Sequence, residues 1–195
     1  MLTPYLQQAP AARLILEISI AAFVVGEFLQ AMRVRRGTTR TNPAAEVWFR
    51  AIFIGGLLLI PMGLAFAPNA VIGGGVWLFC LGGVIGWSGL LLRWWSFLTL
   101  GKYFTVVLRT SEDQPVIDRG PYRALRHPSY TGLLVAVAGC GLMVANWVST
   151  AGSAALVLIG LVYRIRIEER ALNAALGHSY RDFAVHRARL VPFVW

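Results

Sequence analysis

Hydrophobic residues in this chain gather into long runs that are separated by short polar segments. The first three runs cover residues 14 to 32, 48 to 66 and about 76 to 97. Each run is close to the ~20 residues that an α-helix needs to cross a bilayer. The pattern therefore predicts three membrane-spanning helices in the N-terminal half of the chain.

Two shorter apolar runs follow, residues 131 to 145 and 149 to 163, and only residues 146 to 148 separate them. This pattern predicts a helical hairpin with antiparallel arms. At 1.5 Å per residue each arm covers about 23 Å, which is less than the ~30 Å hydrocarbon core. We therefore expect the polar segments that flank the hairpin to lie near the headgroups and to meet in space. These segments are residues 119 to 130 and the residues after Tyr163.

Composition supports a membrane protein. Hydrophobic residues make up 57% of the 195 positions, charged residues make up 14%, and the mean hydropathy is +0.62. Soluble domains of this size rarely combine these values. We predict an all-α, polytopic membrane protein with about five transmembrane helices, a C-terminal helical hairpin and a cytoplasmic amphipathic tail. Residues 1–195 are expected to form one membrane domain, in which residues 1–98 supply three spans and residues 99–195 supply a polar loop, the hairpin and the tail.

The net charge of +9 could indicate a nucleic-acid partner, but the basic residues lie mainly in the gaps between the apolar runs. With five spans, 17 of the 18 basic residues fall on one side of the membrane and only Arg13 falls on the other. The positive-inside bias then places the N-terminus outside and the C-terminus in the cytoplasm, as in a bacterial inner membrane protein. We therefore expect no nucleic-acid partner.

The segment from Arg119 to Tyr130 concentrates polar and cyclic side chains just before the hairpin. Pro128 lacks an N–H group and disfavours the α conformation at His127, so we expect a helix to start here. The free N–H groups of its first turn would suit a carboxylate or phosphate. The alternative is a plain helix start with membrane-anchoring Arg and Tyr side chains.

Some polar and small residues lie inside the apolar runs. Glu17 and Glu27 lie in the first run, where carboxylates are costly and normally pair with a cation or mark a pathway. The third run is closed by Arg93 and two Trp residues, a combination typical of a membrane interface. Three glycines in the third run provide a smooth face for close helix packing, namely Gly82, Gly86 and Gly89.

Charged residues also follow the hairpin. Arg164 and Glu168 are four residues apart and share one helical face, where the simplest interpretation is an intrahelical ion pair. The alternative is a fixed guanidinium and a fixed carboxylate that bind an anionic lipid-borne group and a polar cosubstrate. His178 and His186 lack further ligands at metal-binding spacing, so no metal site is expected.

Several motifs in the C-terminal half are specific when their order and spacing are taken together. They are Leu100 to Thr105, Gly120-Pro121-Tyr122, Arg126 to Gly132, Glu168-Glu169 with Leu172, Gly177 and Tyr180, and the ending Leu190 to Phe193. This set resembles the isoprenylcysteine carboxyl methyltransferase family, part of the isoprenylcysteine and phospholipid methyltransferase superfamily. Members of the family are membrane enzymes that use S-adenosylmethionine.

The resemblance implies an S-adenosylmethionine-dependent O-methyltransferase whose partner is a lipophilic, isoprenyl-type or prenylated substrate at the membrane interface. It implies that Arg164 positions the acceptor carboxylate and that the polar loop after residue 99 binds cosubstrate. Arg109 lies near the place of a cosubstrate-binding Gln of the family, which leaves the role of Arg109 open. The positions that match the family's cosubstrate site are Gln114, Pro115, Val116, Ile117, Tyr122, His127, Pro128, Ser129, Tyr130 and Glu168.

Three other interpretations remain open from the sequence. Phospholipid N-methyltransferases share the His-Pro-x-Tyr and Glu-Glu elements, but an amine acceptor would need a base. Membrane sterol reductases resemble the hairpin more loosely and use NADPH, whose phosphate could bind Arg119, Arg123 and Arg126. The third interpretation is a non-catalytic lipid-binding or packing subunit in which these motifs serve as membrane anchors.

Overall fold

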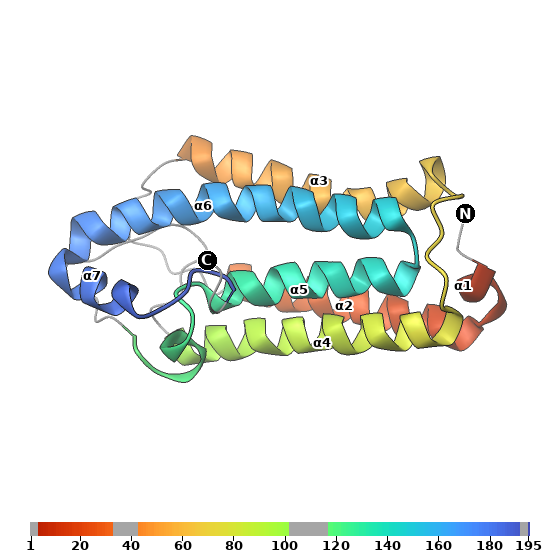
Figure 1. The fold of residues 1–195 in the computed structure, drawn as a ribbon, viewed down its shortest axis with the longest axis horizontal. Helices are drawn as coiled ribbons and strands as arrows, with labels where there is room; N and C mark the ends of the chain where they lie inside the picture. The colour runs from red at the N-terminus through yellow and green to blue at the C-terminus, as the bar shows by residue number, and fades with distance from the viewer. Residues whose placement is uncertain (1–3, 33–42, 102–116, 192–194) are drawn as a thin grey trace.

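The computed structural model describes residues 4–32, 43–101, 117–191 and 195, and this part of the chain is helical apart from two isolated β-bridges. The predicted all-α class is confirmed. In chain order the elements are α1 (Pro4–Gln8), α2 (Pro10–Met32), α3 (Pro43–Phe66), α4 (Gly75–Leu100), the 3-10 helix η2 (Gly120–Arg123), α5 (Pro128–Val144), the π-helical turn η3 (Val148–Gly152), α6 (Ser153–Leu176) and α7 (His178–Val185) (Figure 1).

Three of the described helical segments are long and apolar enough to cross a membrane, judged by length and composition. They are Val47–Phe66, Gly75–Leu100 and Val148–Leu176, and Pro128–Val144 is a shorter apolar helix. The chain is therefore an integral membrane protein. The count of five spans remains a prediction.

Helices α4 and α5 lie side by side in close contact (Figure 1). A methyl group added at Gly139 would collide with the backbone of Gly86, and one added at Gly89 would collide with the backbone of Ala136. The same holds at Gly82, where an added Cβ would lie 2.6 Å from the backbone nitrogen of Met143. The predicted packing role of the glycine face is therefore confirmed, because only residues without a side chain allow this approach.

Helix α6 packs mainly against α3, so the two arms of the hairpin diverge toward different partners (Figure 1). The buried Asn146 in the turn donates to the carbonyl of Ala67 at 2.8 Å and accepts from the backbone of Ser149 at 2.9 Å. The Ser149 hydroxyl donates to the carbonyl of Ile60 at 2.7 Å. These bonds connect the hairpin turn to α3 in a region where water is scarce and backbone groups need internal partners.

Helix α6 is longer than the predicted run that ends at residue 163. It continues as one helix to Leu176, and Gly177 then adopts a positive φ of 53° before α7 begins at His178. Since glycine adopts this conformation without a Cβ clash, it ends α6 and lets the chain turn back. As a consequence Arg164 and Glu168 lie on a continuous helix, which fixes their relative position.

Arg93 points into the bundle, and its predicted position at a membrane interface stays a prediction. Helix α4 continues to Leu100, and the Arg93 side chain is turned inward, with the residue only 7% exposed. Its guanidinium binds Glu27 of α2 through Nε–Oε1 at 2.5 Å and Nη2–Oε2 at 2.8 Å. The negative charge of Glu27 on the neighbouring helix therefore allows the Arg93 cation to be buried inside the bundle.

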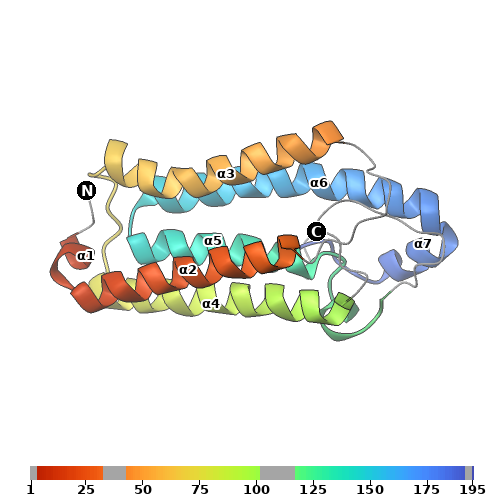
Figure 2. The same ribbon diagram turned by 180° about the vertical axis from the view of Figure 1, so that it is seen from behind.

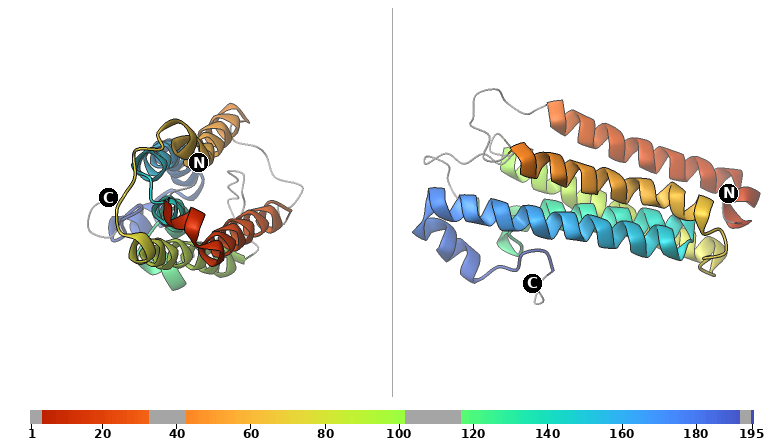
Figure 3. Two further views of the ribbon diagram at one scale, coloured as in Figure 1. Left: turned by 90° about the vertical axis from the view of Figure 1, so that its right-hand side faces the viewer. Right: turned by 90° about the horizontal axis from the view of Figure 1, so that it is seen from above.

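An apolar cavity of about 430 Å³ lies between α2, α3, α4 and α5. Its wall includes Phe23, Leu57, Leu90, Val137 and Met143. Helix α2 runs along α4 on the side of the bundle that faces away from the viewer in Figure 1, so Figure 2 shows it in front (Figure 2). Figure 3 shows the same helix from one end of the bundle and from above (Figure 3). The volume falls within the ~300–1,000 Å³ typical of small-molecule pockets.

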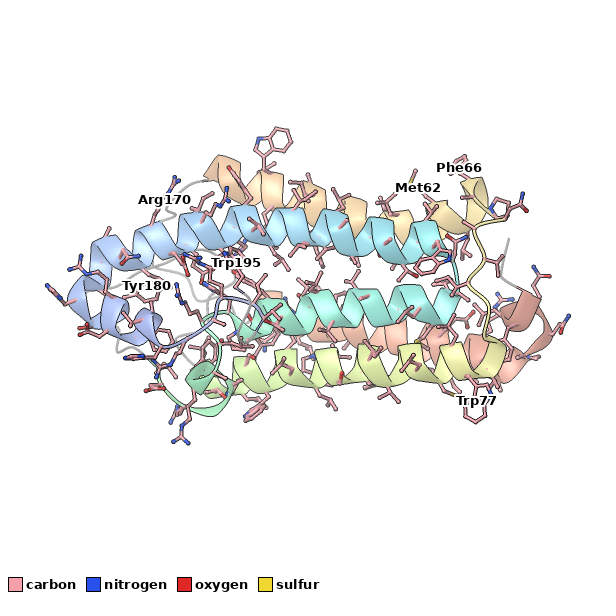
Figure 4. The ribbon with its side chains drawn as sticks, in the orientation of Figure 1. Met62, Phe66, Trp77, Arg170, Tyr180 and Trp195 are labelled. Atoms are coloured by element: carbon pink, nitrogen blue, oxygen red, sulfur yellow. The ribbon has the colours of Figure 1, made fainter. Side chains whose placement is uncertain are left out.

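The two ends of the bundle differ in side-chain chemistry. At one end lie Arg170 and Tyr180 together with many nitrogen-bearing side chains, whereas Phe66 and Trp77 mark the opposite end (Figure 4). Phe66 and Trp77 are each 81% exposed, as expected for aromatic side chains at a membrane surface. The sequence-predicted site residues lie at the charged end.

Candidate active site

The start of α5 is held in place by the C-terminal segment. As predicted, the helix begins at Pro128, and the backbone of His127 just before it is non-helical, with φ −126° and ψ 56°. The His127 N–H donates to the carbonyl of Arg189 at 3.1 Å, and the Thr131 hydroxyl donates to the carbonyl of Leu190 at 2.7 Å. The C-terminal segment therefore covers the first turn of α5.

Tyr130 connects the two arms of the hairpin. Its hydroxyl donates to Oε2 of Glu168 at 2.7 Å and accepts from Nε of Arg164 at 2.7 Å. Its ring stacks on the His127 ring, with centroids 5.5 Å apart and planes 13° apart. The predicted meeting of the two polar segments is therefore confirmed, and Tyr130 links Arg164 to Glu168.

Arg164 is buried, with the residue 6% exposed, and its guanidinium lies over an aromatic ring of α3. The distance from its central carbon to the centroid of Phe49 is 4.5 Å. Stacking on Phe49 and the bond to Tyr130 restrict the plane of the guanidinium. A cation held in this way has a defined direction for recognition of a planar anion.

Glu169 has different hydrogen-bond partners from its neighbour Glu168. Its Oε1 accepts from Nη1 of Arg126 at 2.9 Å, and its Oε2 accepts from Nε of Arg189 at 2.9 Å. Consecutive helix residues point about 100° apart, because a turn contains 3.6 residues. One carboxylate therefore faces Tyr130 while the next holds the C-terminal segment and the loop before α5.

Two buried polar atoms near these carboxylates have no hydrogen-bond partner within the described part of the chain. They are Nε2 of His127 and the hydroxyl of Tyr180. Nε2 of His127 lies 3.6 Å from Oε1 of Glu169, which is too long for a hydrogen bond. Leaving such a group unsatisfied costs about 1–3 kcal/mol, so both atoms are suited to contact a polar ligand.

Two tyrosines of this region, Tyr122 in η2 and Tyr180 in α7, lie outside the membrane-spanning segments and are protonated. Burial is the main cause that raises the pKa of Tyr122 and the pKa of Tyr180 far above the usual range, and the negative charge of Glu168 adds to it at Tyr122. Both hydroxyls therefore remain available as hydrogen-bond donors at neutral pH.

The structure brings together most of the predicted site residues that it describes. Tyr130, Glu168 and Arg164 form one hydrogen-bonded group, and Tyr122 and Ser129 are buried. His127 stacks on Tyr130, Pro128 is fully buried at the start of α5, and Ile117 is half-buried beside η2. Three predicted cosubstrate residues and the unassigned arginine lie outside the described residues, namely Gln114, Pro115, Val116 and Arg109.

Sequence reasoning gave no role to Phe49, named Glu169 only as part of a motif, and named Arg126 only as a possible phosphate ligand. The adjacent pair Glu168-Glu169 was a signal for two carboxylates on different helix faces. No pattern in the sequence indicated the partners of Glu169, because Arg189 lies in a segment without regular secondary structure. In the part of the chain that the structure describes, no group of three or more His, Cys, Asp or Glu side chains is placed to hold a metal ion.

Comparison with known proteins gives a consistent result. Residues 83–174 match the isoprenylcysteine carboxyl methyltransferase (ICMT) family. Protein-S-isoprenylcysteine O-methyltransferase A of Arabidopsis thaliana is 35% identical over 108 residues, which cover 54% of this chain and 55% of that protein. Protein-S-isoprenylcysteine O-methyltransferase of Tribolium castaneum is 28% identical over 120 residues, covering 60% and 43%. The chain therefore spans about half the length of these curated relatives.

The fold also has a solved counterpart. It is similar to the structure of the eukaryotic intramembrane Ras methyltransferase ICMT, with a TM-score of 0.67 and 20% sequence identity. The similarity covers 95% of this chain and 69% of that protein, so it includes the N-terminal helices as well. Together with the match of residues 83–174, it confirms the predicted resemblance to the isoprenylcysteine carboxyl methyltransferase family.

Proposed function

We propose that this protein transfers a methyl group from S-adenosylmethionine to a carboxylate on a lipophilic, isoprenyl-type substrate at the membrane interface. The observation that carries the proposal is the linked group of Arg164, Tyr130 and Glu168. It places a cation and an anion on either side of one hydroxyl. A donor that carries ammonium and sulfonium charges and an acceptor that carries a carboxylate require such a pair of binding groups.

The proposed methyl transfer needs few catalytic groups from the protein. A carboxylate oxygen attacks the methyl carbon, a C–O bond forms, and the C–S bond breaks to leave neutral S-adenosylhomocysteine. The acceptor is ionised at neutral pH, so no general base is needed. Alignment of the two reactants and exclusion of water are the effects that accelerate such a step. The buried Arg164 and the partly buried Tyr130, which are bonded to each other, suit this task.

S-adenosylmethionine is proposed to bind between η2, the start of α5 and α6. Glu168 would accept hydrogen bonds from its polar groups, and Tyr122 and the unpartnered Nε2 of His127 would line the site. Asp118, next to Ile117, binds Arg187 of the C-terminal segment at 2.7 Å and so anchors the chain where the predicted cosubstrate segment ends.

The acceptor carboxylate is proposed to bind Arg164, and its apolar tail is proposed to extend toward the cavity. A row of aromatic rings leads in this direction: Phe49 stacks on Phe53 at 6.1 Å, and Phe53 lies 6.5 Å from Phe23, which lines the cavity. Along α5, Met143 lies 13 residues beyond Tyr130, or about 20 Å. The path and the cavity therefore suit a long, flexible hydrocarbon chain.

The NADPH interpretation is less well supported by the charges of the site. Arg126 is engaged with Glu169 and with the carbonyl of Arg187, so it holds the structure together. Calorimetric titration of the purified protein with S-adenosylmethionine and, separately, with NADPH distinguishes the two cofactors. Binding of S-adenosylmethionine, followed by methylation of an S-prenylated N-acetylcysteine, is the expected result. Binding of NADPH alone would refute the proposal.

The proposed topology places the N-terminus outside and the C-terminus in the cytoplasm, in a bacterial inner membrane. This orientation gives cytosolic S-adenosylmethionine access to the charged end of the bundle. Reporter domains fused after Pro68 and after Trp147 are expected to be active only in the external compartment. The reverse pattern would place the site on the wrong side for its cosubstrate.

A further inference from the structure

A buried ion pair connects α2 to α4 beside the proposed site. Glu27 and Arg93 form two parallel bonds, Nε–Oε1 at 2.5 Å and Nη2–Oε2 at 2.8 Å, and the exposed fractions of the side chains are 26% and 9%. Glu27 lies outside residues 83–174, so it is not part of the matched region of the family. The pair therefore supplies a link between the N-terminal helices and the matched region.

Arg93 also makes a third bond. Its Nη1 donates to the carbonyl oxygen of Ser129, in the first turn of α5, at 2.9 Å. Ser129 directly precedes Tyr130, whose hydroxyl donates to Glu168 at 2.7 Å. The ion pair is thus bonded to the backbone of the first turn of α5, next to the residue that contacts Glu168.

The geometry of the guanidinium explains why the carboxylate matters for the third bond. The N–H groups of arginine lie in one plane with fixed directions. When Glu27 occupies Nε and Nη2, the plane of Arg93 is set, and Nη1 is directed at Ser129. The Arg93 side chain also packs over the Phe97 ring at 4.7 Å, which holds it from the other side.

We propose that Glu27 and Arg93 are positioning residues for the cosubstrate site, which hold the first turn of α5, with Ser129 and Tyr130, in the arrangement that binds S-adenosylmethionine. This inference rests on the proposed function for the identity of the ligand. A pair that only neutralised a buried arginine would affect stability, whereas a positioning pair also affects the affinity of the folded protein for cosubstrate.

Glu27→Gln removes the charge and keeps the side-chain volume, and Arg93→Lys keeps the charge but loses the fixed fork. For both variants we expect the affinity of folded protein for S-adenosylmethionine to fall by about three- to tenfold, the value of one hydrogen bond. The Michaelis constant for the lipophilic acceptor should change by less than about twofold, because Arg164 is untouched. Glu17→Gln is the matched control, because Glu17 lies on the same helix in an exposed i,i+4 pair with Arg13.

A second measurement needs no cosubstrate. Hydrogen–deuterium exchange of the amides in the first turns of α5 should become faster in Glu27→Gln and stay unchanged in Glu17→Gln. If the wild-type protein bound no S-adenosylmethionine, the proposed function would fail, yet this measurement would still decide whether the pair holds α5. Unchanged exchange in Glu27→Gln would overturn the inference.

A double variant that exchanges the two charges distinguishes a pair that positions α5 from a pair that only neutralises the buried arginine. In the double variant Glu27→Arg with Arg93→Glu, the ion pair can form again, but a carboxylate at position 93 cannot donate to the Ser129 carbonyl. We expect the melting temperature to recover relative to Glu27→Gln, while cosubstrate affinity stays low. Recovery of both quantities would mean that the pair is only structural. If the double variant does not fold, the single variants and the exchange measurement decide.

Discussion

The charged end of the bundle and its apolar half are stabilised in different ways. At the charged end, side chains distant in sequence are joined by directed bonds, as where Glu169 holds Arg126 and Arg189. In the apolar half, α4 and α5 meet through glycine backbone, and a cavity remains between these helices and α2 and α3. Directed bonds fix single orientations, whereas apolar contacts tolerate different shapes. We infer that the first region aligns the reacting groups and the second accommodates a variable tail.

The largest expected effect comes from breaking the charged end at Glu169. Its side chain is 12% exposed, and Glu169→Ala would leave Arg126 and Arg189 without their carboxylate. Removal of one partner of a buried pair costs about 3–5 kcal/mol, and we expect a loss near the lower limit because Arg189 is partly exposed. Thermal unfolding in detergent measures the change. Asp182→Ala, an exposed carboxylate on α7, serves as the control, and an equal effect in both variants would contradict the role of Glu169.

An intermediate effect is expected at Glu168, which faces the proposed cosubstrate. Glu168→Gln retains the shape but loses the charge that accepts hydrogen bonds. The affinity for S-adenosylmethionine should fall by about 1.5–3 kcal/mol, as for a hydrogen bond to a charged group. Calorimetric titration measures the loss. A dissociation constant equal to that of the wild type would exclude Glu168 from the cosubstrate site.

The smallest expected effect lies in the apolar half. Met143→Ala enlarges the far part of the cavity and should shift the preference toward acceptors with a longer hydrocarbon tail by about 1 kcal/mol in relative kcat/KM. Methylation assays with acceptors of two or more tail lengths measure this preference. Val84→Ala, on the exposed face of α4, is the control. If both variants keep the same preference, the tail does not reach the cavity.

Local sequence signals predicted the features that depend on neighbouring residues. Pro128 predicted the start of α5, and the spaced glycines predicted the packing face of α4. The short hairpin predicted that the two polar segments meet, because antiparallel arms return the chain to the same end, and Tyr130 and Glu168 make that contact. Each of these predictions needs only helix geometry and chain connectivity.

Contacts between separate helices could not be predicted in the same way. The sequence showed a carboxylate at Glu27 and a cation at Arg93, but no pattern indicated the register of α2 against α4, so their ion pair was not predicted. The stacking of Arg164 on Phe49 depends on the packing of α6 against α3, which again has no local signal. In both cases tertiary packing decides which charges are buried.

Substitution of Arg164 is the most direct test of the proposal that this residue binds the acceptor carboxylate. Arg164→Lys retains the charge without the planar fork, and Arg164→Ala removes both. Methyl transfer to the lipophilic acceptor should fall by roughly 10²-fold in Arg164→Ala and by less in Arg164→Lys, because alignment is lost.

The same protein samples are used to measure affinity for S-adenosylmethionine, with Tyr130→Phe as the comparison, because that change removes the hydroxyl bonded to Glu168. We expect both Arg164 variants to bind S-adenosylmethionine nearly as well as the wild type, whereas Tyr130→Phe should bind it more weakly. Equal losses of cosubstrate affinity and methyl transfer in the Arg164 variants would contradict the assignment of Arg164 to the acceptor.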